Sequence, residues 1–446
     1  MIVLSLNCGS SSAKYRLYDY DKKVTLATGI VERVGIGKSF IQQAGLGRAP
    51  IQIDHDCANH KDALKLIIDT LLDPKVGVLD DLKKISAVGH RVVHGGEKFK
   101  KSVIIDAASL DTFKALYSLA PLHNPPNVLG IEAAMDVLPS IPHMAIMDTA
   151  WHQTMPAHAY MYALPYEWYE KYGVRRYGFH GTSFLYVAKR AALLLGKDPF
   201  KTNLICLHIG NGVSANAIKN GVSYDTSMGL TPLEGLVMAT RAGDHDAAID
   251  LMMMEKENIA PAKMNDLLNK KSGLLGITGK YTDRRDVQKA AEAGEARAAL
   301  AIEMESYRIK KYIGAYLAAI GGADAIVFTA GVGEMSDLIR EKSLDGLEFL
   351  GIKLDKAKNK LAKTRNAETE ISAEDSKVKI FVIPTDEERV FIEDVIALLQ
   401  GTYDEHTRFT YRFQHPDYVN SQREQDFAAD CAKKPGLDKI QVKPKK

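Results

Sequence analysis

Two short turns rich in glycine and serine, in distant parts of the chain, constrain its fold most. The first turn, residues 7–12, lies between apolar runs at 2–6 and 13–18. The second turn, residues 208–212, lies between equally apolar runs. Runs of this length on either side of a glycine turn are typical of the two strands of a hairpin. The pattern predicts two strand–turn–strand units in an α/β chain.

Both turns have the chemistry that suits phosphate oxygens. Their backbone N–H groups are uncrowded by large side chains, serines line the first turn, and Lys14 follows it. Backbone amides that converge in such a turn bind anions. The two units therefore indicate a duplicated phosphotransferase core whose two phosphate-binding hairpins face each other.

Composition excludes several classes of protein. Of the 446 residues, 46% are hydrophobic and 26% are charged, which is ordinary for a globular protein of two to three domains. The formal net charge of +2 gives no reason to expect binding to nucleic acid. The four cysteines form no C-x-x-C pair, which fits a reducing compartment. No apolar run approaches the ~20 residues of a membrane span, and no signal peptide is evident at the first residues. We expect a cytoplasmic protein with no membrane partner.

Periodicity predicts that strands and helices alternate along the rest of the chain. The expected strands are 24–34, 85–89, 144–147, 325–329 and 379–383. The expected helices are 61–72, 127–138, 244–256, one from Pro261, a long helical region at 286–320, and 387–399. Alternating aromatic residues at 409–413 hint at one more edge strand, before a short basic tail. Charged residues at the carboxyl ends of the buried strands are site candidates, because open α/β sheets bind ligands there.

Nine separated motifs make the chain resemble the acetokinase family of the acetate and sugar kinase/Hsp70/actin superfamily, over residues 1 to about 400. They are NCGSSSAKY (7–15), GHRVVHGGE (89–97), APLHNPPN (120–127), DTAWH (148–152), RRYGFHGTS (175–183), HIGNGVSA (208–215), DTSMGLTPLEGLVMATRAGDHD (225–246), SGLLGITG (272–279) and FTAGVGE (328–334). A lone glycine-rich turn would be weak evidence, whereas unrelated chains would not share this ordered set.

The resemblance implies a fold of two actin-like (ribonuclease H-like) α/β domains, with a nucleotide cleft between them. The N-terminal domain would comprise residues 1–150, completed by about 386–400. The nucleotide-binding C-terminal domain would comprise 151–385, and residues 401–446 would be an extension. The family also implies a homodimer.

The family is known for reversible transfer of the γ-phosphoryl group of ATP to acetate, which gives acetyl phosphate and ADP and needs Mg²⁺, with Mn²⁺ as a substitute. A propionate or other short-chain fatty acid kinase is the first alternative. An actin-like nucleotide sensor without kinase activity is the second alternative, from a different class. A sensor would not need cations on the side of the acid substrate, and here these cations are present.

The resemblance also assigns catalytic residues. Arg91 matches the arginine that holds the acyl substrate, since a guanidinium can bind a carboxylate through two parallel hydrogen bonds. Arg241 matches the arginine that contacts the migrating phosphoryl group, and His180 the histidine that stabilises the transition state. Asp148 matches the catalytic aspartate, which either orients Arg91 or holds magnesium through water. No strong general base is needed, because the attacking carboxylate is already ionised.

The remaining implied residues bind metal, acid and nucleotide. Asn7 and Glu387 match the magnesium-binding positions, with Glu388 as an alternative to Glu387. The acid would meet Val93, Leu122, Phe179, Pro232 and His123. The nucleotide would meet Lys14, His208, Ile209, Gly210, Asn211, Gly212, Asp283, Arg284, Arg285, Gly331, Val332, Gly333, Glu334 and Met335. The family usually has asparagine where this chain has Met335, so we expect an altered contact to the base.

Overall fold

The structure is a computed structural model that describes residues 1–121 and 123–444. The chain forms two compact units. Unit 1 comprises Met1–Gln153 and Glu387–Tyr411, and unit 2 comprises Thr154–Asp386 and Arg412–Lys446. The chain therefore passes between the units more than once, and each unit is built from separate stretches of sequence.

Unit 1 is built on an eight-stranded sheet with the order β5-β4-β3-β2-β1-β6-β8-β7. Strands β1, β6 and β8 are parallel to one another, and β2 and β3 extend the sheet as antiparallel strands from β1. The strands are β1 (Ile2–Cys8), β2 (Ser12–Asp19), β3 (Val24–Glu32), β4 (Phe40–Gly45), β5 (Ile51–Asp54), β6 (Ile85–Val92), β7 (Val103–Ile104) and β8 (His143–Met147). The helices are α1 (His60–Leu72), α2 (Ala107–Ala115), α3 (Asn124–Val137) and α15 (Glu387–Leu399), with 3₁₀ turns at Leu82–Lys84 and Ala150–Thr154.

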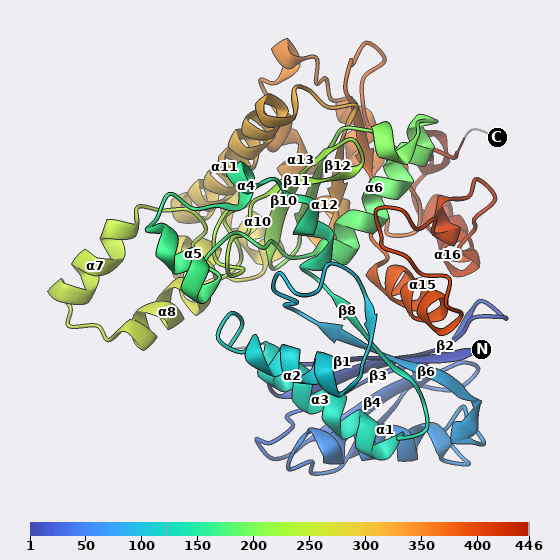
Figure 1. Ribbon diagram of the computed structural model, residues 1–446. Coiled ribbons are helices and arrows are strands. Elements are labelled where there is room, and N and C mark those ends of the chain that lie inside the picture. Colours follow the sequence, from blue (N-terminus) through green and yellow to red (C-terminus); the bar gives the residue numbers. More distant parts are fainter. Residues whose placement is uncertain (122, 445–446) are drawn as a thin grey trace. The chain divides into compact units, whose positions relative to one another are not determined.

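Helices cover both faces of this sheet, as Figure 1 shows for α1, α3 and α15. Leu4 and Leu6 of β1 pack with α1 and α3, whereas Val3 packs with α15 on the opposite face. Side chains alternate between the two faces of a strand, so an apolar run such as 2–6 fits a strand that is covered on both sides. Burial on both faces therefore explains why the apolar residues of β1 follow one another instead of alternating with polar residues.

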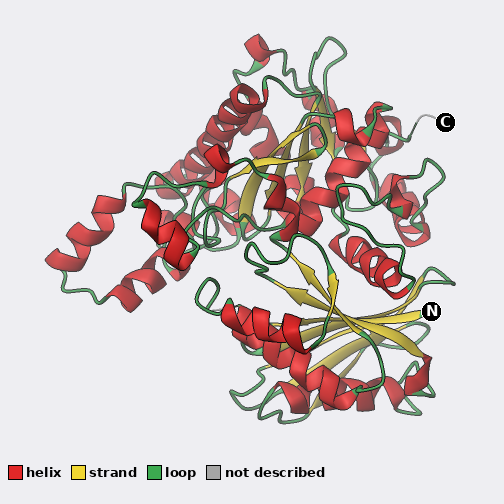
Figure 2. Ribbon diagram, in the orientation of Figure 1, coloured by secondary structure: helices red, strands yellow, loops and turns green. Residues whose placement is uncertain are grey.

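Unit 2 is built on a six-stranded sheet with the order β11-β10-β9-β12-β14-β13. Strands β9, β12 and β14 are parallel, and β10 and β11 extend the sheet as antiparallel strands from β9. The strands are β9 (Leu204–Ile209), β10 (Val213–Lys219), β11 (Val222–Thr226), β12 (Ala325–Thr329), β13 (Thr369–Glu370) and β14 (Lys379–Val382). Figure 2 shows this sheet in yellow with helices on both sides.

Unit 2 also contains most of the helices. They are α4 (Ala157–Tyr160), α5 (Tyr166–Tyr172), α6 (Gly181–Leu195), α7 (Ala247–Lys256), α8 (Pro261–Lys270), α9 (Gly273–Thr278), α10 (Arg284–Glu292), α11 (Ala296–Ile320), α12 (Ala330–Met335), α13 (Asp337–Leu344), α14 (Lys356–Leu361) and α16 (Ser421–Lys433). Short 3₁₀ turns lie at Pro199–Lys201, Glu348–Leu350, Arg412–Gln414 and Leu437–Ile440. Helices α6 and α11 contact the central strand β9 of the sheet.

The two sheets share one core topology, which confirms the expected α/β class and the duplication. In each unit an antiparallel three-strand meander is followed by two parallel strands, with the spatial order 3-2-1-4-5. This order is β3-β2-β1-β6-β8 in unit 1 and β11-β10-β9-β12-β14 in unit 2. The two glycine-rich turns join the first two strands of each core, so they are equivalent positions of a repeated fold.

Two local predictions were wrong. The helical region 286–320 is two helices, α10 and α11, because Gly294 between them has a φ of +92° that a helix cannot contain. Residues 409–413 form no strand, since a 3₁₀ turn starts at Arg412 and residues 409–411 pair with no other strand.

No helix among the described residues combines the length and the apolar character that a membrane crossing requires.

Candidate active site

The ends of three parallel strands bring candidate residues together in unit 1. Asn7 lies near the end of β1, Arg91 near the end of β6, and Asp148 directly follows β8. These strands are hydrogen-bonded neighbours in the order β1-β6-β8, so their carboxyl ends share one edge of the sheet. The edge is the position at which open α/β sheets bind ligands.

Arg91 and Asp148 form a bidentate ion pair at this edge. The Nε of Arg91 donates to Oδ1 of Asp148 at 3.0 Å, and Nη2 donates to Oδ2 at 2.6 Å. The Asp148 side chain is 3% exposed, whereas that of Arg91 is 32% exposed. The Asp148 charge raises the pKa of Arg91 above its usual value, so the guanidinium stays charged. Within the described part of the chain, Nη1 of Arg91 has no hydrogen-bond acceptor, and this end of the guanidinium can bind an anion.

Two buried asparagines of α3 hold the segment that follows Arg91. The amide of Asn127 accepts a hydrogen bond from the Val93 N–H at 3.0 Å and donates to the Cys8 carbonyl at 2.7 Å. Asn124 bonds both backbone groups of His94, at 3.2 and 2.9 Å. Asn127 thus ties the first glycine-rich turn to the strand that carries Arg91. Nothing in the local sequence singles out Asn127, although it lies in the APLHNPPN motif.

Unit 1 also contains residues that were predicted to bind the acid or the nucleotide. Val93 is half-buried directly after β6, and His123 is half-buried at the N-terminus of α3. Lys14 is exposed on β2 and pairs in register with Asn7 across the hairpin. Leu122 lies outside the described residues.

Glu387 is the first residue of α15, and its charge contributes to the raised pKa of Arg91. Its neighbour Glu388 forms an ion pair with Arg16 and is half exposed. Of the two adjacent carboxylates, Glu387 therefore acts electrostatically on the Arg91 site, and Glu388 is engaged elsewhere. No cluster of three or more histidine, cysteine, aspartate or glutamate side chains able to hold a metal ion is present among residues 1–121 and 123–444.

In unit 2, two stacked histidines lie beside the second glycine-rich turn. The rings of His180 and His208 are 4.0 Å apart with an interplanar angle of 14°. The Nδ1 of His180 bonds the Ser214 hydroxyl at 2.8 Å, and the Nδ1 of His208 bonds the Ser183 hydroxyl at 2.9 Å. In both histidines the Nδ1 is thus occupied, which fixes the ring orientation. Both serines belong to motifs of the resemblance, but no pattern in the sequence distinguishes them from their neighbours.

Arg241 lies next to the same turn. A Cβ added to Gly212 would be 3.4 Å from Nη1 of Arg241 and 3.4 Å from Cε1 of His180, so both side chains border this glycine. Burial lowers the pKa of Arg241, and among the described residues no oxygen accepts a hydrogen bond from its guanidinium, whose one polar contact is the Met238 sulfur at 3.9 Å. A partly buried guanidinium without an acidic partner is an anion-binding group.

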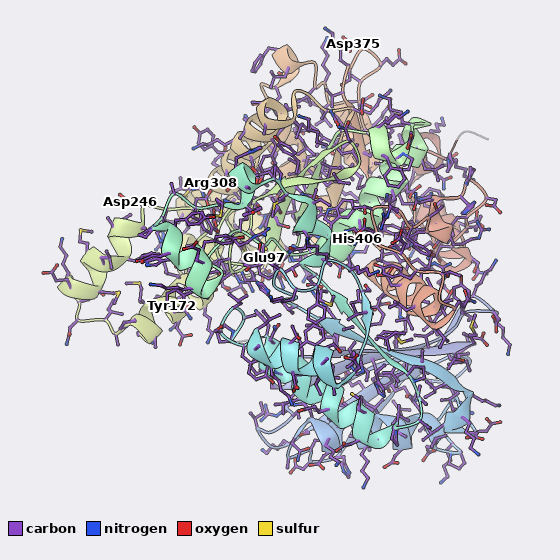
Figure 3. All side chains as sticks on the ribbon, in the orientation of Figure 1. Glu97, Tyr172, Asp246, Arg308, Asp375 and His406 are labelled. Atoms are coloured by element: carbon purple, nitrogen blue, oxygen red, sulfur yellow. The ribbon has the colours of Figure 1, made fainter. Side chains whose placement is uncertain are left out.

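The segment that carries Arg241 is held from both sides. The Ala239 N–H donates to the carbonyl of Asn211, at 3.2 Å, in the glycine-rich turn. Asp244 accepts from the Gly235 N–H at 2.7 Å and from the Tyr312 hydroxyl at 2.7 Å. Arg308 of α11, labelled in Figure 3, donates to the carbonyls of Gly235 and Asp244 at 3.1 and 3.0 Å. Residues of α11 thus support the segment.

The three residues of the predicted nucleotide segment 283–285 differ in the direction of their side chains. Asp283 caps α10 and pairs with the exposed Arg285. Arg284 instead points inward and forms a buried ion pair with Glu305 of α11. The expectation that Arg284 contacts the nucleotide is therefore not supported by the position of its guanidinium.

The segment 331–335 forms most of α12. Glu334 is buried and accepts a hydrogen bond from the Thr385 N–H at 3.2 Å, and burial raises its pKa. Met335, at the end of α12, is 38% exposed. Ala330, the first residue of α12, has a φ of +64°, a left-handed conformation that is strained in any residue other than glycine. A Cβ added to Gly210 would lie 3.9 Å from the Cβ of Ala330, so the strained residue borders the glycine-rich turn.

Two expected pocket residues also lie in unit 2. Phe179 is 3% exposed and directly precedes His180. Pro232 is half-buried in the segment before the one that carries Arg241. The remaining turn residue, Ile209, is fully buried in β9, so its backbone alone is available to a ligand.

Comparison with known proteins identifies relatives of the whole chain. The profile of the acetokinase family matches residues 2–393. Acetate kinase of Geobacter metallireducens (strain ATCC 53774 / DSM 7210 / GS-15) is 61% identical over 421 residues, which are 94% of this chain and 100% of that protein.

Two solved structures are similar along nearly their full length. The crystal structure of Porphyromonas gingivalis acetate kinase has a TM-score of 0.86 and 46% identity, over 89% of this chain and 99% of that one. The structure of a propionate kinase from Francisella tularensis subsp. tularensis SCHU S4 has a TM-score of 0.82 and 40% identity, over 89% and 99%. The chain belongs to the acetokinase family.

Proposed function

We propose that the chain catalyses the reversible transfer of the γ-phosphoryl group of ATP to acetate. The observation that carries the proposal is one arginine in each unit, Arg91 and Arg241, with donor groups that the described residues leave unpaired. Transfer between two anions requires positive charge on the acid and on the migrating group, and little other chemistry from the protein. Membership of the acetokinase family, with relatives named acetate kinase, supports the same reaction.

Arg91 binds the acetate carboxylate through the end of its guanidinium that Asp148 leaves open. Asp148 acts as a positioning residue, because both of its oxygens are already used by Arg91. It does not need to accept a proton, since acetate is ionised at neutral pH. The carboxylate attacks the γ-phosphorus, the bond from phosphorus to the β–γ bridging oxygen breaks, and ADP leaves with the electron pair.

Arg241 and His180 stabilise the charge on the transferring phosphoryl group. The backbone amides of residues 208–212, together with Lys14, bind the phosphates of the nucleotide. Half-buried Asp283, exposed Arg285 and the outer surface of α12 serve the nucleoside.

Asn7 and Glu387 are the residues that would hold Mg²⁺ or Mn²⁺. An amide oxygen and one carboxylate fit a hard cation that keeps several water ligands. Glu387 suits this role better than Glu388, because Glu388 is paired with Arg16. When bound, the cation neutralises charge on the phosphates of ATP.

Of the residues that the family resemblance assigns to the acid, Val93, Phe179 and Pro232 are apolar and suit the methyl group of acetate. The propionate kinase among the structural relatives makes a propionate-preferring enzyme the second candidate. We further propose that units 1 and 2 correspond to the two expected domains. The enzyme is a cytoplasmic homodimer, and its four free cysteines suit a reducing compartment.

The direct test measures acetyl phosphate formed from ATP, Mg²⁺ and acetate, trapped with hydroxylamine as the hydroxamate. The proposal predicts that hydroxamate and ADP form in equal amounts and only when acetate is present. A nucleotide sensor would bind ATP or hydrolyse it slowly without a response to acetate, and that result would refute the proposal.

A further inference from the structure

A run of three consecutive carboxylates, Asp386, Glu387 and Glu388, lies at the start of α15. The chain passes from unit 2 to unit 1 within this run, between Asp386 and Glu387. After Asp148, Glu387 is the carboxylate whose charge raises the pKa of Arg91, and the proposed function assigns the cation to it. Any of three adjacent carboxylates can bind a divalent cation, so the selection of the middle one requires a cause.

The two outer carboxylates are each engaged by an arginine. In unit 1, Glu388 forms an ion pair with Arg16 of β2. In unit 2, Nη2 of Arg423 lies 3.9 Å from the Asp386 carboxylate, and the side-chain amide of Asn420 donates to the same carboxylate at 3.4 Å. The Asp386 side chain is 15% exposed, so water screens these contacts only in part. The neighbours of the middle carboxylate are thus held on both sides.

Arg423 also holds the backbone that leads to Glu387. Its Nη1 donates to the Pro384 carbonyl at 3.1 Å, and its Nη2 donates to the Thr385 carbonyl at 2.7 Å. A planar guanidinium that bonds two successive carbonyls fixes the peptide groups in one orientation, which the single ammonium of a lysine cannot do. The Thr385 N–H donates in addition to Glu334 at 3.2 Å. The chain is therefore held up to the position that precedes the proposed metal ligand.

The helix that carries Arg423 is itself attached to unit 2. This helix, α16, lies beyond the family match, which ends at residue 393. Asp430 of α16 accepts hydrogen bonds from Thr364 at 2.6 Å and Asn366 at 3.0 Å. The helix is capped by Asn420, whose side-chain oxygen accepts from the Arg423 N–H at 3.2 Å. The guanidinium therefore acts from a folded support rather than from a loose tail.

We propose that Arg423 is a positioning residue of the metal site. It holds the backbone at 384–386 and the Asp386 carboxylate, so that Glu387 and not its neighbour meets the cation. The inference rests on the proposed function, because it takes Glu387 to be a ligand of the cation that accompanies the nucleotide. It gives the C-terminal segment, which lies outside the family match, a part in the reaction.

The test measures the Kd of ADP by calorimetry, once with saturating Mg²⁺ and once with EDTA and no divalent cation. The Kd in EDTA divided by the Kd in Mg²⁺ is the contribution of the cation to nucleotide binding. Damage to the nucleotide site changes both Kd values, whereas a displaced metal ligand changes only the Kd in Mg²⁺. We expect Mg²⁺ to tighten binding to the wild type, and Glu387→Gln should remove most of this gain.

Arg423→Ala should lower the ratio by about tenfold, the lower end of the loss that is typical when a group supporting a metal ligand is removed. The sign of the change separates positioning from charge. An arginine that merely repelled the cation would, when removed, raise the ratio. Arg423→Lys keeps the charge but not both carbonyl bonds, so its ratio should lie between those of Arg423→Ala and the wild type.

The double variant Glu387→Gln/Arg423→Ala decides whether Arg423 acts through Glu387. If it does, Arg423→Ala has no further effect on the ratio once the carboxylate is absent. Arg408→Ala is the matched control, because this exposed arginine also follows α15 and pairs with Asp404 at 2.8 Å. Its ratio should equal that of the wild type. Thermal melting verifies that each variant is folded, and Arg423→Lys carries the test if Arg423→Ala is not.

An unchanged or higher ratio in Arg423→Ala, a wild-type ratio in Arg423→Lys, or losses that multiply in the double variant would overturn the inference. So would a wild-type ratio in Glu387→Gln, because the cation would then not depend on this carboxylate. Failure of the proposed function has a different signature, since the wild type would show the gain from Mg²⁺ but form no hydroxamate from acetate.

Discussion

The bidentate pair of Arg91 and Asp148 is the residue-scale feature on which the proposed binding of acetate depends. Asp148 occupies Nε and Nη2 of the guanidinium and leaves Nη1 directed elsewhere. A lysine at this position would keep the charge but could not contact Asp148 and a second carboxylate in the same planar geometry. Loss of a hydrogen bond to a charged group costs about 1.5–3 kcal/mol.

We therefore expect Arg91→Lys to raise the KM for acetate by about tenfold or more, with a smaller effect on the KM for ATP. Steady-state kinetics of both substrates measures this. Arg48→Lys is the control, because Arg48 is an exposed arginine of the same unit that donates to the Lys75 carbonyl. An acetate KM equal to that of the wild type would remove Arg91 from the proposed acid site.

At this scale, family resemblance predicted roles for Arg91, Asp148, His180 and Arg241 from single motifs. It gave no role to Asn127, because the contacts of this side chain with Val93 and Cys8 join residues that are far apart in the sequence. Arg284 shows the opposite case. Its motif lies in a predicted nucleotide segment, but packing of α10 on α11 buries its guanidinium against Glu305.

At the scale of elements, α12 begins with a strained residue. Ala330 has a φ of +64°, and a left-handed conformation costs a residue with a Cβ about 1–2 kcal/mol. Glycine relieves this strain but loses about 0.5–1 kcal/mol through the entropy of the unfolded chain. The two terms nearly cancel.

We expect Ala330→Gly to leave the Tm unchanged or slightly higher. In contrast, Ala298→Gly in the buried face of α11 should lower the Tm by several degrees, since glycine weakens a helix and leaves a small void. Calorimetry of both variants tests this. If both substitutions lower the Tm equally, the conformation assigned to Ala330 is contradicted.

A buried carboxyl in the middle of α15 gives unit 1 a pH-dependent stability. Asp394 accepts from the Ser102 hydroxyl at 2.6 Å and from the Tyr411 hydroxyl at 2.8 Å, and burial raises its pKa to about 7. The unfolded chain would release this proton near the ordinary value of 3.8. Because the folded state holds the proton more tightly, stability from this group is full below pH 4 and is lost as the pH rises towards and through 7.

Asn cannot ionise, so Asp394→Asn should gain stability relative to the wild type as the pH rises from 5 to 8. The Tm of both proteins at the two pH values measures the gain. Asp404→Asn, at an exposed position of the same unit, should show a constant difference. A constant difference for Asp394→Asn would mean that its carboxyl is ionised in the folded protein throughout this range.

Elements with strong apolar periodicity were predicted well, and those that depend on distant contacts were not. The apolar runs of β1, β9 and β12 are short and are buried on both faces of their sheets, which is the pattern typical of such strands. The alternation of aromatic residues at 409–413 is typical of a strand. In the structure, Tyr411 is buried and its hydroxyl donates a hydrogen bond to Asp394 of α15. Such a contact has no signature in the local sequence.

At the scale of the whole molecule, duplication explains why the two glycine-rich turns look alike. Each joins the first two strands of a five-strand core with the order 3-2-1-4-5. Unit 1 carries Arg91 near the end of β6, and unit 2 carries Arg241 beside its glycine-rich turn. The two copies of the core therefore place their arginines on different elements.

The preference for one acid tests the whole-molecule assignment against a propionate kinase. An additional methylene changes discrimination by about 10–200-fold in an apolar pocket. Because the proposed acid substrate carries only a methyl group, kcat/KM should be highest for acetate, about tenfold or more lower for propionate, and lower still for butyrate. A hydroxamate assay with the three acids measures the order, and a higher value for propionate would support the second candidate.

The most direct test of the central claim is a double-mutant cycle of Arg91→Ala and Arg241→Ala on the rate of acetyl phosphate formation. If both arginines act on one phosphoryl transfer, each single variant loses about 100-fold or more, and the double variant loses much less than the product of the two. Two independent losses that simply multiply, or a single variant with wild-type activity, would contradict the account.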